Sequence, residues 1–318
     1  MLASVAFIVV GILMLAWSAE RFVDSAAAIA ANLRMPPMMI GLTIVSFGTS
    51  LPEMLVSATA AFNGDPDIGI GNVLGSNIAN IGLVLGLTAL IAPLAVKSQT
   101  LKREMPLLFM VTFLAFVLMA DGALGRVDGV ILLVMLLLAL FWLIRISLSE
   151  RHDPLMQEFA ESIPVDMGMG RSAATFLIAL ALMVISSRLL VHGSVEIARY
   201  LGVSDLVIGL TIIAVGTSLP ELMASVVSAL KHEADLAIGN AIGSNMFNLL
   251  SVLAMPALIH PGRFASAALL RDFPVMLAFT CALFVVSFGR KGGVINRLEG
   301  VLLVTAFAGY LYLLYLQA

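Results

Sequence analysis

The sequence is poor in charge and nearly lacks cysteine. Charged residues make up 12% of the 318 positions, against 61% apolar residues and a mean hydropathy of +1.07. Cys281 is the only cysteine, so no internal disulfide can form, and cysteine says little about the redox compartment. The net charge of −3 is small, and no basic cluster with interleaved aromatic residues suggests a nucleic-acid partner. This balance predicts an integral membrane protein, with the lipid bilayer as its surroundings.

Long apolar runs account for the balance. They can cross about 30 Å of hydrocarbon and lack the ten-residue alternation of outer-membrane barrels, so the spans are predicted to be helices. No basic segment precedes the first run and no small-residue cleavage pattern follows it, which indicates a retained helix. The fold prediction is an all-α integral membrane protein of ten transmembrane helices, near residues 3–19, 38–62, 68–91, 106–120, 129–146, 172–198, 206–230, 236–259, 267–288 and 298–316.

Lysine and arginine are shared unequally between the alternating loops. With the N-terminus outside, 12 of the 17 basic residues, including all four lysines, fall on the inner side. Because basic residues favour cytoplasmic loops, both termini are predicted to be extracytoplasmic and the linker 151–168 to be cytoplasmic. We expect a multi-pass protein of the inner (plasma) membrane. The outer side keeps Arg126, Arg188, Arg199, Arg263 and Arg271.

The chain also contains an internal repeat. GLTIVSFGTSLPEMLVSAT at 41–59 returns as GLTIIAVGTSLPELMASVV at 209–227, and GIGNVLGSNIAN at 69–80 returns as AIGNAIGSNMFN at 237–248. Both pairs have the same offset along the chain, and 18 of the 31 positions are identical. Residues 1–150 and 169–318 are therefore predicted to be two copies of one unit. Five spans is an odd number, so the copies would be inverted in the membrane, as in many transporters with a midplane binding site.

Each copy places a glutamate inside an apolar span. Thr49 and Glu53 lie at i and i+4 on one helix face, beside Ser50, and Pro52 must disturb the helix because proline lacks an N–H. Irregular backbone at this depth is tolerated only inside protein or along a cavity. Four helices can thus bring oxygen atoms to one point, from Thr49, Ser50, Glu53, Ser76 and Asn80 of the first copy and Thr217, Ser218, Glu221, Ser244 and Asn248 of the second.

Such a site suits a hard cation. Calcium takes 6–8 oxygen ligands in flexible geometry, and Na+ accepts similar ligands with less charge, whereas Mg2+ keeps its waters. The motifs contain no His or Cys, which argues against zinc or copper. At a separation of about 6 Å and an effective dielectric of about 20, the two glutamates would repel by roughly 3 kcal/mol. A carrier whose site is empty and doubly charged should resist switching from one face of the membrane to the other. A carrier that switches only when an ion is bound is an exchanger.

The paired GTSLPE and GNxxGSN segments resemble the alpha repeats of the cation/calcium exchanger superfamily, closest to its compact prokaryotic sodium/calcium exchangers. The resemblance covers both halves. It implies ten helices in two inverted repeats, a central site shared by Ca2+ and Na+, and alternating access in which the first and sixth helices slide across a core of eight. It also implies Glu53 and Glu221 as main ligands, with side-chain or backbone oxygens of the other eight site residues and the carbonyls of Ser46 and Ala214 beside them.

One departure from the family pattern concerns charge. Some members of the superfamily carry an aspartate where this chain has Asn80 or Asn248, so the site here has two carboxylates. That charge matches one Ca2+ and leaves the Na+ stoichiometry and any K+ coupling open. The short linker also lacks the regulatory insert of some family members.

A proton-coupled calcium exchanger of the same superfamily is the nearest alternative to sodium/calcium exchange. A channel is disfavoured by the inverted repeat with broken helices, and an intramembrane protease by the absence of an aspartate dyad. We expect no enzyme activity, no cofactor and no obligate protein partner.

Structural roles are predicted for the remaining motif residues. Gly71 with Gly75, and Gly239 with Gly243, have the small-xxx-small spacing of closely packed helices. Asn77 and Asn245 are predicted to cap or cross-link helices. Charged residues at the ends of the first and sixth spans are predicted to be solvated or interfacial, with gating contacts as the alternative; they are Glu20, Asp24, Arg188, His192 and Glu196.

Overall fold

A computed structural model describes residues 2–95, 98–150, 167–202, 212, 214–288 and 293–317. Most of the predicted linker, residues 151–166, and the start of the span 206–230 lie outside these ranges. The first half contains α1 (Leu2–Leu33), α2 (Pro37–Ile40), the π-helix η1 (Gly41–Val45), α3 (Ser46–Thr49), α4 (Leu51–Phe62), α5 (Pro66–Ala79), the π-helix η2 (Asn80–Leu85), α6 (Gly86–Ile91), β1 (Leu94–Ala95), α7 (Ser98–Met119), β2 (Ala123–Leu124) and α8 (Arg126–Glu150).

The second half follows the same order. It contains α10 (Met169–Tyr200), α12 (Ala214–Thr217), α13 (Leu219–Leu230), α14 (Ala234–Phe247), the π-helix η4 (Asn248–Val252), α15 (Ala254–Ile259), β3 (Gly262–Arg263), the π-helix η5 (Ala268–Asp272), α16 (Phe273–Phe288), β4 (Val294–Ile295) and α17 (Arg297–Gln317). The helices α3, α4, α5 and α6 recur as α12, α13, α14 and α15, with both ends of each helix shifted by the offset of the sequence repeat. The sequence repeat is therefore also a repeat of local structure.

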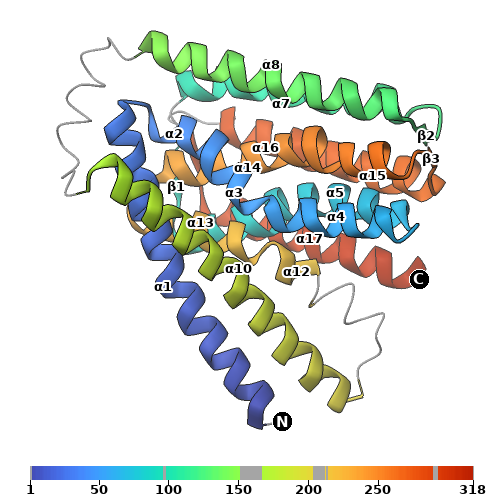
Figure 1. The fold of residues 1–318 in the computed structure, drawn as a ribbon, viewed down its shortest axis with the longest axis horizontal. Helices are drawn as coiled ribbons and strands as arrows, with labels where there is room; N and C mark the ends of the chain where they lie inside the picture. The colour runs from blue at the N-terminus through green and yellow to red at the C-terminus, as the bar shows by residue number, and fades with distance from the viewer. Residues whose placement is uncertain are drawn as a thin grey trace.

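The two halves meet through two very short strand pairs. β1 pairs with β4, and β2 pairs with β3, both antiparallel. β1 and β3 hold equivalent places in the two copies, and the two pairs lie at opposite ends of the bundle (Figure 1). This reciprocal exchange is expected of inverted copies. The division into two inverted five-span units remains a prediction.

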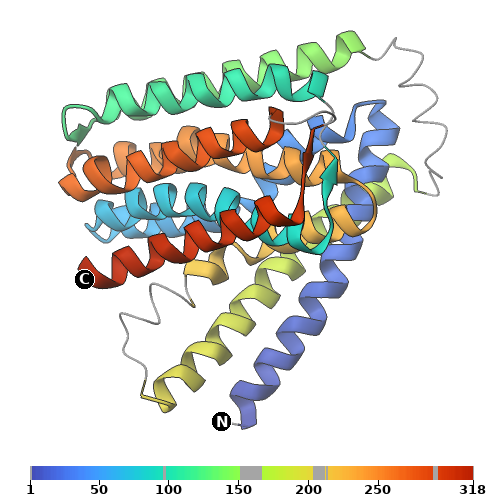
Figure 2. The same cartoon turned by 180° about the vertical axis from the view of Figure 1, so that it is seen from behind.

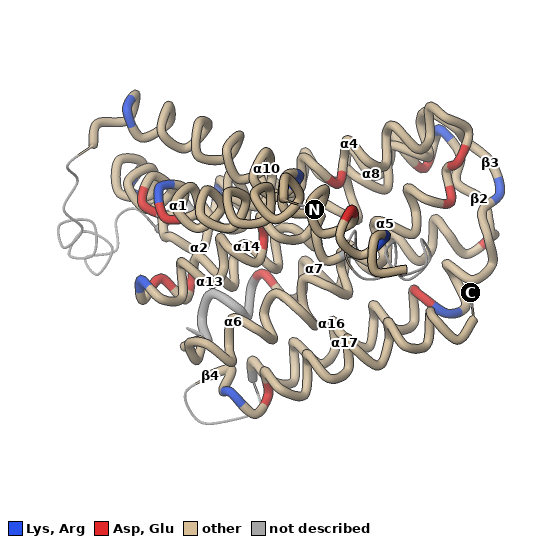
Figure 3. The backbone as a smooth tube through the Cα atoms, turned by 90° about the horizontal axis from the view of Figure 1, so that it is seen from below, with Lys and Arg blue, Asp and Glu red and all other residues tan. Residues whose placement is uncertain are grey.

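The structure is a multi-pass helical membrane protein. Seven described helices are long and apolar enough to cross a membrane, or eight if the bent pair Pro37–Thr49 and Leu51–Phe62 is one span. The shorter apolar helices Glu104–Met119 and Leu219–Leu230 add two candidates, and the count of ten spans remains a prediction. Lys and Arg gather toward the two ends of the bundle (Figure 3).

The helices that carry the GNxxGSN motifs lie at the centre. In the spans Pro66–Ile91 and Ala234–Ile259, 78% and 83% of the apolar window is buried, against 22% in Arg126–Ile146 and Arg297–Gln317. α8 and α17 therefore form the outside of the bundle, with large apolar side chains exposed as a lipid-facing surface requires.

α1 and α10 form a separate antiparallel pair, inclined to the other helices (Figures 1 and 2). Glycine allows their backbones to approach, since a Cβ at Gly11 would lie 3.0 Å from Leu190 N and one at Gly193 would lie 2.5 Å from Ser4 O. Phe22 and Phe176 stack with ring centroids 4.5 Å apart in a second apolar core beneath the pair. The pair thus packs on the bundle as a unit with its own core.

α1 is longer than the predicted span of residues 3–19, and its two acidic residues, Glu20 and Asp24, are paired. Lys231, just after α13, forms ion pairs with Asp24 and, at 3.7 Å, with Glu20. The helix continues past these charges to Leu33 because Phe22, Ala26 and Ile29 are buried. Glu20 and Asp24, predicted to be solvated or interfacial, pair in the structure with Lys231 at the end of α13.

The predicted glycine packing holds for α14. A Cβ at Gly239 would lie 2.5 Å from Met38 O, and one at Gly243 would lie 2.6 Å from Leu42 O and clash with Ser46 Oγ. At Gly71 and Gly75 of α5, a Cβ would meet no described atom within 4 Å. The close contact is therefore described only between α14 and the first copy's η1 region.

Replacing Gly243 by alanine is expected to destabilise the protein, because backbone atoms of η1 cannot move aside without disturbing the bent helix. A cost of about 1–3 kcal/mol is typical of overpacking. Melting temperature in detergent measures the effect. Gly309→Ala in α17 is the matched control, since its Cβ meets no described atom within 4 Å. Equal melting temperatures for the two variants would contradict the packing role of Gly243.

Candidate cation site

The two glutamates lie in the first turns of helices that begin at a break. Ser50, with φ −81° and ψ 0°, separates α3 from α4, and the two arms of this segment are bent by 41°. Ser218 separates α12 from α13 in the same way. The break follows from Pro52 and Pro220, which cannot donate a backbone hydrogen bond and push away the carbonyl four residues earlier. Glu53 and Glu221 consequently lie beside the positive ends of α4 and α13.

A second irregularity marks the predicted amide ligands. α5 becomes the π-helix η2 at Asn80, and α14 becomes the π-helix η4 at Asn248. Single π-helical turns inside α-helices are frequently found at functional sites because they redirect side chains. The helices that carry the site are therefore irregular at the same two positions in each copy.

Nine of the ten predicted ligands are buried, and Thr217 is partly exposed. Glu53, Glu221, Ser50, Asn80 and Asn248 are each 1% exposed. Six of the ten predicted ligands have a buried oxygen with no hydrogen-bond partner among the described residues: Ser50 Oγ, Ser218 Oγ, Glu53 Oε2, Glu221 Oε2, Asn80 Oδ1 and Asn248 Oδ1.

These six atoms form three pairs of equivalent positions in the two copies. An unsatisfied buried polar atom costs about 1–3 kcal/mol. Six oxygens in one symmetric set would therefore be a large loss of stability unless a ligand satisfies them. All six are oxygen atoms whose lone pairs can coordinate a cation.

The two carboxyl groups of the site have no basic partner among the residues that the structure describes. The carboxylate of Glu53 lies close enough to that of Glu221 to repel it. Among the described residues, neither glutamate forms an ion pair with Lys, Arg or His. Within the same residues no group of three or more His, Cys, Asp or Glu could hold a metal ion. Two carboxylates surrounded by neutral oxygens favour a hard cation over zinc or copper.

Hydrogen bonds join the two copies at the site. Thr49 Oγ1 lies 3.2 Å from Asn240 Oδ1 and 3.4 Å from Ser244 Oγ, and the Glu221 carboxylate is also within its reach. Asn80 Nδ2 donates to Asn245 Oδ1 at 3.1 Å, so Asn245 links helices of the two copies, as predicted. Asn77 Nδ2 donates to Val73 O at 2.8 Å, within its own helix.

Two cavities reach the site at Thr217. One, of about 270 Å3, lies between α5, α12, the end of η5 and α17 and is also lined by Ser76 and Asn72. The other, of about 350 Å3, lies under α10 and is also lined by Pro52 and Pro220. Thr217 is partly exposed, whereas its counterpart Thr49 is fully buried. The site is therefore open on the side of Thr217.

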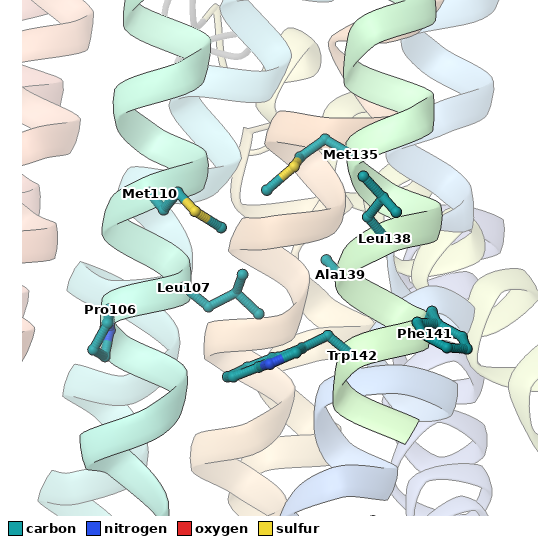
Figure 4. A pocket seen from close by; sticks show the side chains of 8 residues that line it. All are labelled: Pro106, Leu107, Met110, Met135, Leu138, Ala139, Phe141 and Trp142. Carbon is teal, nitrogen blue, oxygen red and sulfur yellow. The ribbon is translucent and has the colours of Figure 1, made fainter. Parts of the chain in front are cut away.

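A larger cavity of about 750 Å3 has a different character. It lies between α7 and α8 and is lined by Met110, Leu138, Phe141, Trp142 and other apolar residues (Figure 4). Leu138 and Phe141 are 56% and 62% exposed, as side chains that face lipid would be. It contains none of the predicted ligands.

Two residues at the site were overlooked in the sequence. Asn72 and Asn240, which belong to the repeated GN pair, donate from Nδ2 to the backbone carbonyls of Glu53 and Glu221. The sequence contained one sign of their role, because asparagine occupies this position in both copies.

Comparisons with known proteins agree with this geometry. The family model described as "Sodium/calcium exchanger protein" matches residues 3–145 and 171–316. The chain belongs to the sodium/calcium exchanger family. It is 50% identical over 99% of both chains to "Putative antiporter CaxA" of Alkalimonas amylolytica. It is 30% identical over 97% of both chains to "Sodium/calcium exchanger MaX1" of Methanosarcina acetivorans.

Solved structures give the same result. The sodium-calcium exchanger NCX_Mj, soaked with Na+ and Sr2+, aligns with a TM-score of 0.81 and 31% identity, covering 96% of this chain and 97% of that one. Members of the sodium/calcium exchanger family are transporters. Their similarity to this chain over nearly its whole length supports cation/calcium antiport as its class of activity.

Glu53→Gln and Glu221→Gln are each expected to abolish calcium transport while leaving the protein folded. Each change removes one charge from the site without altering its shape, so the remaining carboxylate binds a divalent cation far more weakly. Calcium uptake into proteoliposomes measures transport, and gel filtration with a melting temperature measures folding. Glu299→Gln, in the first turn of α17, is a control outside the site. Transport at the wild-type rate in either glutamate variant would contradict the assignment.

Proposed function

We propose that the protein exchanges Ca2+ for Na+ across the membrane by alternating access. The transported ions would bind at the centre, where Glu53 and Glu221 are the main ligands. The other oxygens come from Thr49, Ser50, Thr217, Ser218, Ser76, Asn80, Ser244 and Asn248. The observation that carries the proposal is the symmetric set of six buried, unpartnered oxygens around two carboxylates that no described basic residue neutralises.

Charge explains why such a site would exchange ions and not leak them. One Ca2+, or monovalent ions of equal total charge, neutralises the two carboxylates. Empty, the site combines the repulsion of like charges with the cost of removing each from water. The empty carrier therefore stays on one side, and one ion species must bind before the other can return.

The structure fits an outward-open state in the predicted orientation. Both cavities at Thr217 are lined by residues placed on the outer side by charge distribution, Arg188 in one and Arg271 in the other. On the predicted inner side, Lys231 ties the core to Asp24 of α1. The α1 and α10 pair, which packs through its own apolar core, is the natural moving part. The orientation used here is the predicted ten-span, inverted-repeat topology with both termini extracytoplasmic.

Proton coupling is the alternative that the same geometry favours most. Two buried carboxylates that repel each other can bind protons as readily as Na+. Calcium could then exchange for protons at the same glutamates. The ligand set does not distinguish the two, because protonation uses the oxygens that a Na+ would use.

Radioactive calcium uptake into proteoliposomes distinguishes the two couplings. Vesicles loaded with Na+ are compared with vesicles loaded with choline at equal pH, and then with choline vesicles under an imposed proton gradient. The proposal expects rapid uptake only with internal Na+, because outward Na+ movement supplies the free energy. Uptake driven by the proton gradient alone would contradict sodium coupling. Glu53→Gln serves as the control for leakage in every condition.

A further inference from the structure

The amides of Asn72 and Asn240 make the same contacts in both copies. Asn72 Nδ2 lies 3.2 Å from Glu53 O and 3.1 Å from Ser57 Oγ. Asn240 Nδ2 lies 3.3 Å from Glu221 O and 3.1 Å from Ser225 Oγ. Such close agreement between the two copies indicates a functional constraint, since the apolar residues that follow Asn72, Val73 and Leu74, differ from their counterparts after Asn240.

We infer that Asn72 and Asn240 are positioning residues for cation binding: each holds the backbone of one glutamate ligand, and Asn240 also directs the hydroxyl proton of Thr49 away from the ion. The inference deepens the proposed function and rests on it. The two asparagines touch ligand residues and are not ligands themselves.

The orientation of each amide follows from its partners. A backbone carbonyl can only accept a hydrogen bond, so the NH2 group must face Glu53 O or Glu221 O. Both amide protons of Asn240 are then used, on Glu221 O and Ser225 Oγ, and its Oδ1 faces Thr49. Asn80 and Asn248 differ, since their Oδ1 atoms have no hydrogen-bond partner within the described residues. This separates two asparagines that hold the site from two that are available to an ion.

The contact to Thr49 has a consequence for the ion. Thr49 Oγ1 can bind a cation only through its lone pairs, so its proton must point elsewhere. Three oxygens that can only accept lie in reach of that proton: Asn240 Oδ1 at 3.2 Å, Ser46 O at 3.5 Å and the Glu221 carboxylate. When a cation occupies the carboxylate, Asn240 Oδ1 is the nearer of the two that remain. Ser244 Oγ, at 3.4 Å, can then donate to Thr49 Oγ1, which in turn donates to Asn240 Oδ1.

The carbonyl contacts fix the helices that carry the charges. Glu53 and Glu221 lie in the first turns of α4 and α13, directly after a break, where the backbone has fewer internal hydrogen bonds than a helix interior. Asn72 in α5 and Asn240 in α14 attach those turns to the central helices. Ser57 strengthens the first attachment by donating to Gly69 O at 3.2 Å. Without the amide, the carboxylate can shift relative to the other ligands.

Half-saturating calcium concentration for uptake, measured alongside melting temperature, tests the inference. Asn72→Ala and Asn240→Ala are each expected to raise it at least about tenfold, because each removes the amide's hydrogen bond to a glutamate carbonyl together with its other contacts. Thr112→Val is the matched control: its buried hydroxyl donates to Leu108 O at 2.8 Å in α7, outside the site. Half-saturation should be unchanged in this variant, whatever the change does to the melting temperature.

A double-mutant cycle tests the link to Thr49. Combining Thr49→Ala with Asn240→Ala should weaken calcium binding by less than the product of the two single effects, because both remove the contact between Thr49 and Asn240. Combining Thr49→Ala with Asn72→Ala should multiply the two effects. Asn240→Asp keeps an acceptor for Thr49 but loses the donor to Glu221 O, so it should not restore wild-type half-saturation. Effects that multiply in both cycles would overturn the role of Asn240 toward Thr49.

The outcomes separate the inference from the proposed function. Wild-type protein that shows neither calcium uptake nor stabilisation by calcium refutes both. Wild-type uptake with half-saturation unchanged in the asparagine variants, or raised equally in Thr112→Val, refutes the inference alone. If an alanine variant does not fold, Ser57→Ala and Ser225→Ala remove the other partner of each amide. They should raise half-saturation about twofold to fivefold, and unchanged values would again refute the inference.

Discussion

Repulsion between Glu53 and Glu221 is the constraint on which the rest of the structure depends. Two carboxylates held near each other in a lipid-surrounded core are tolerated only where other groups or an ion offset their charge. The described protein supplies two helix N-termini and hydroxyl and amide groups, and no basic side chain. The positive ends of α4 and α13 act within about one turn, so each glutamate has to lie in the first turn. That requirement places a break in the middle of two apolar spans.

The breaks in turn determine the packing around them. A bent helix loses backbone hydrogen bonds, and in hydrocarbon these must be replaced by neighbouring protein. α14 approaches α2 and η1 through Gly239 and Gly243, close enough for Ser46 Oγ to donate to Asn240 O at 3.1 Å. A larger residue at either glycine would separate the helices and leave the break without partners. Gly239, Gly243, Asn72 and Asn240 of the GNxxGSN motifs therefore support irregular backbone beside the two glutamates.

Duplication made much of this predictable from the sequence. The constant offset between the copies, the breaks at Pro52 and Pro220, and the burial of both glutamate-bearing turns follow from residue spacing and the chemistry of proline. The length of α1 could not be predicted in this way. Glu20 and Asp24 resemble the end of a span in the sequence, and their partner Lys231 lies 207 residues from Asp24 along the chain. The roles of Asn72 and Asn240 were equally hidden. A sequence shows that an amide is repeated, but only coordinates show which of its atoms already has a partner.

The distribution of hydrogen bonds separates rigid parts from parts able to move. Around the site, contacts cross between the two copies through Thr49, Asn240, Asn80 and Asn245, so any motion of one copy's central helices must carry the other's. α1 and α10 are joined to each other by glycine contacts and by Ser4 Oγ donating to Glu196 at 2.7 Å. Polar ties from this pair to the core include Lys231 with Asp24 and Ser187 Oγ donating to Gly216 O at 2.6 Å. The first is exposed enough to exchange with water, and the second ends on the broken turn at α12. If the pair slides in the proposed alternating-access cycle, the polar contacts at Asp24 and Ser187 are among those that must break, while the contacts that join the two copies at the centre can stay.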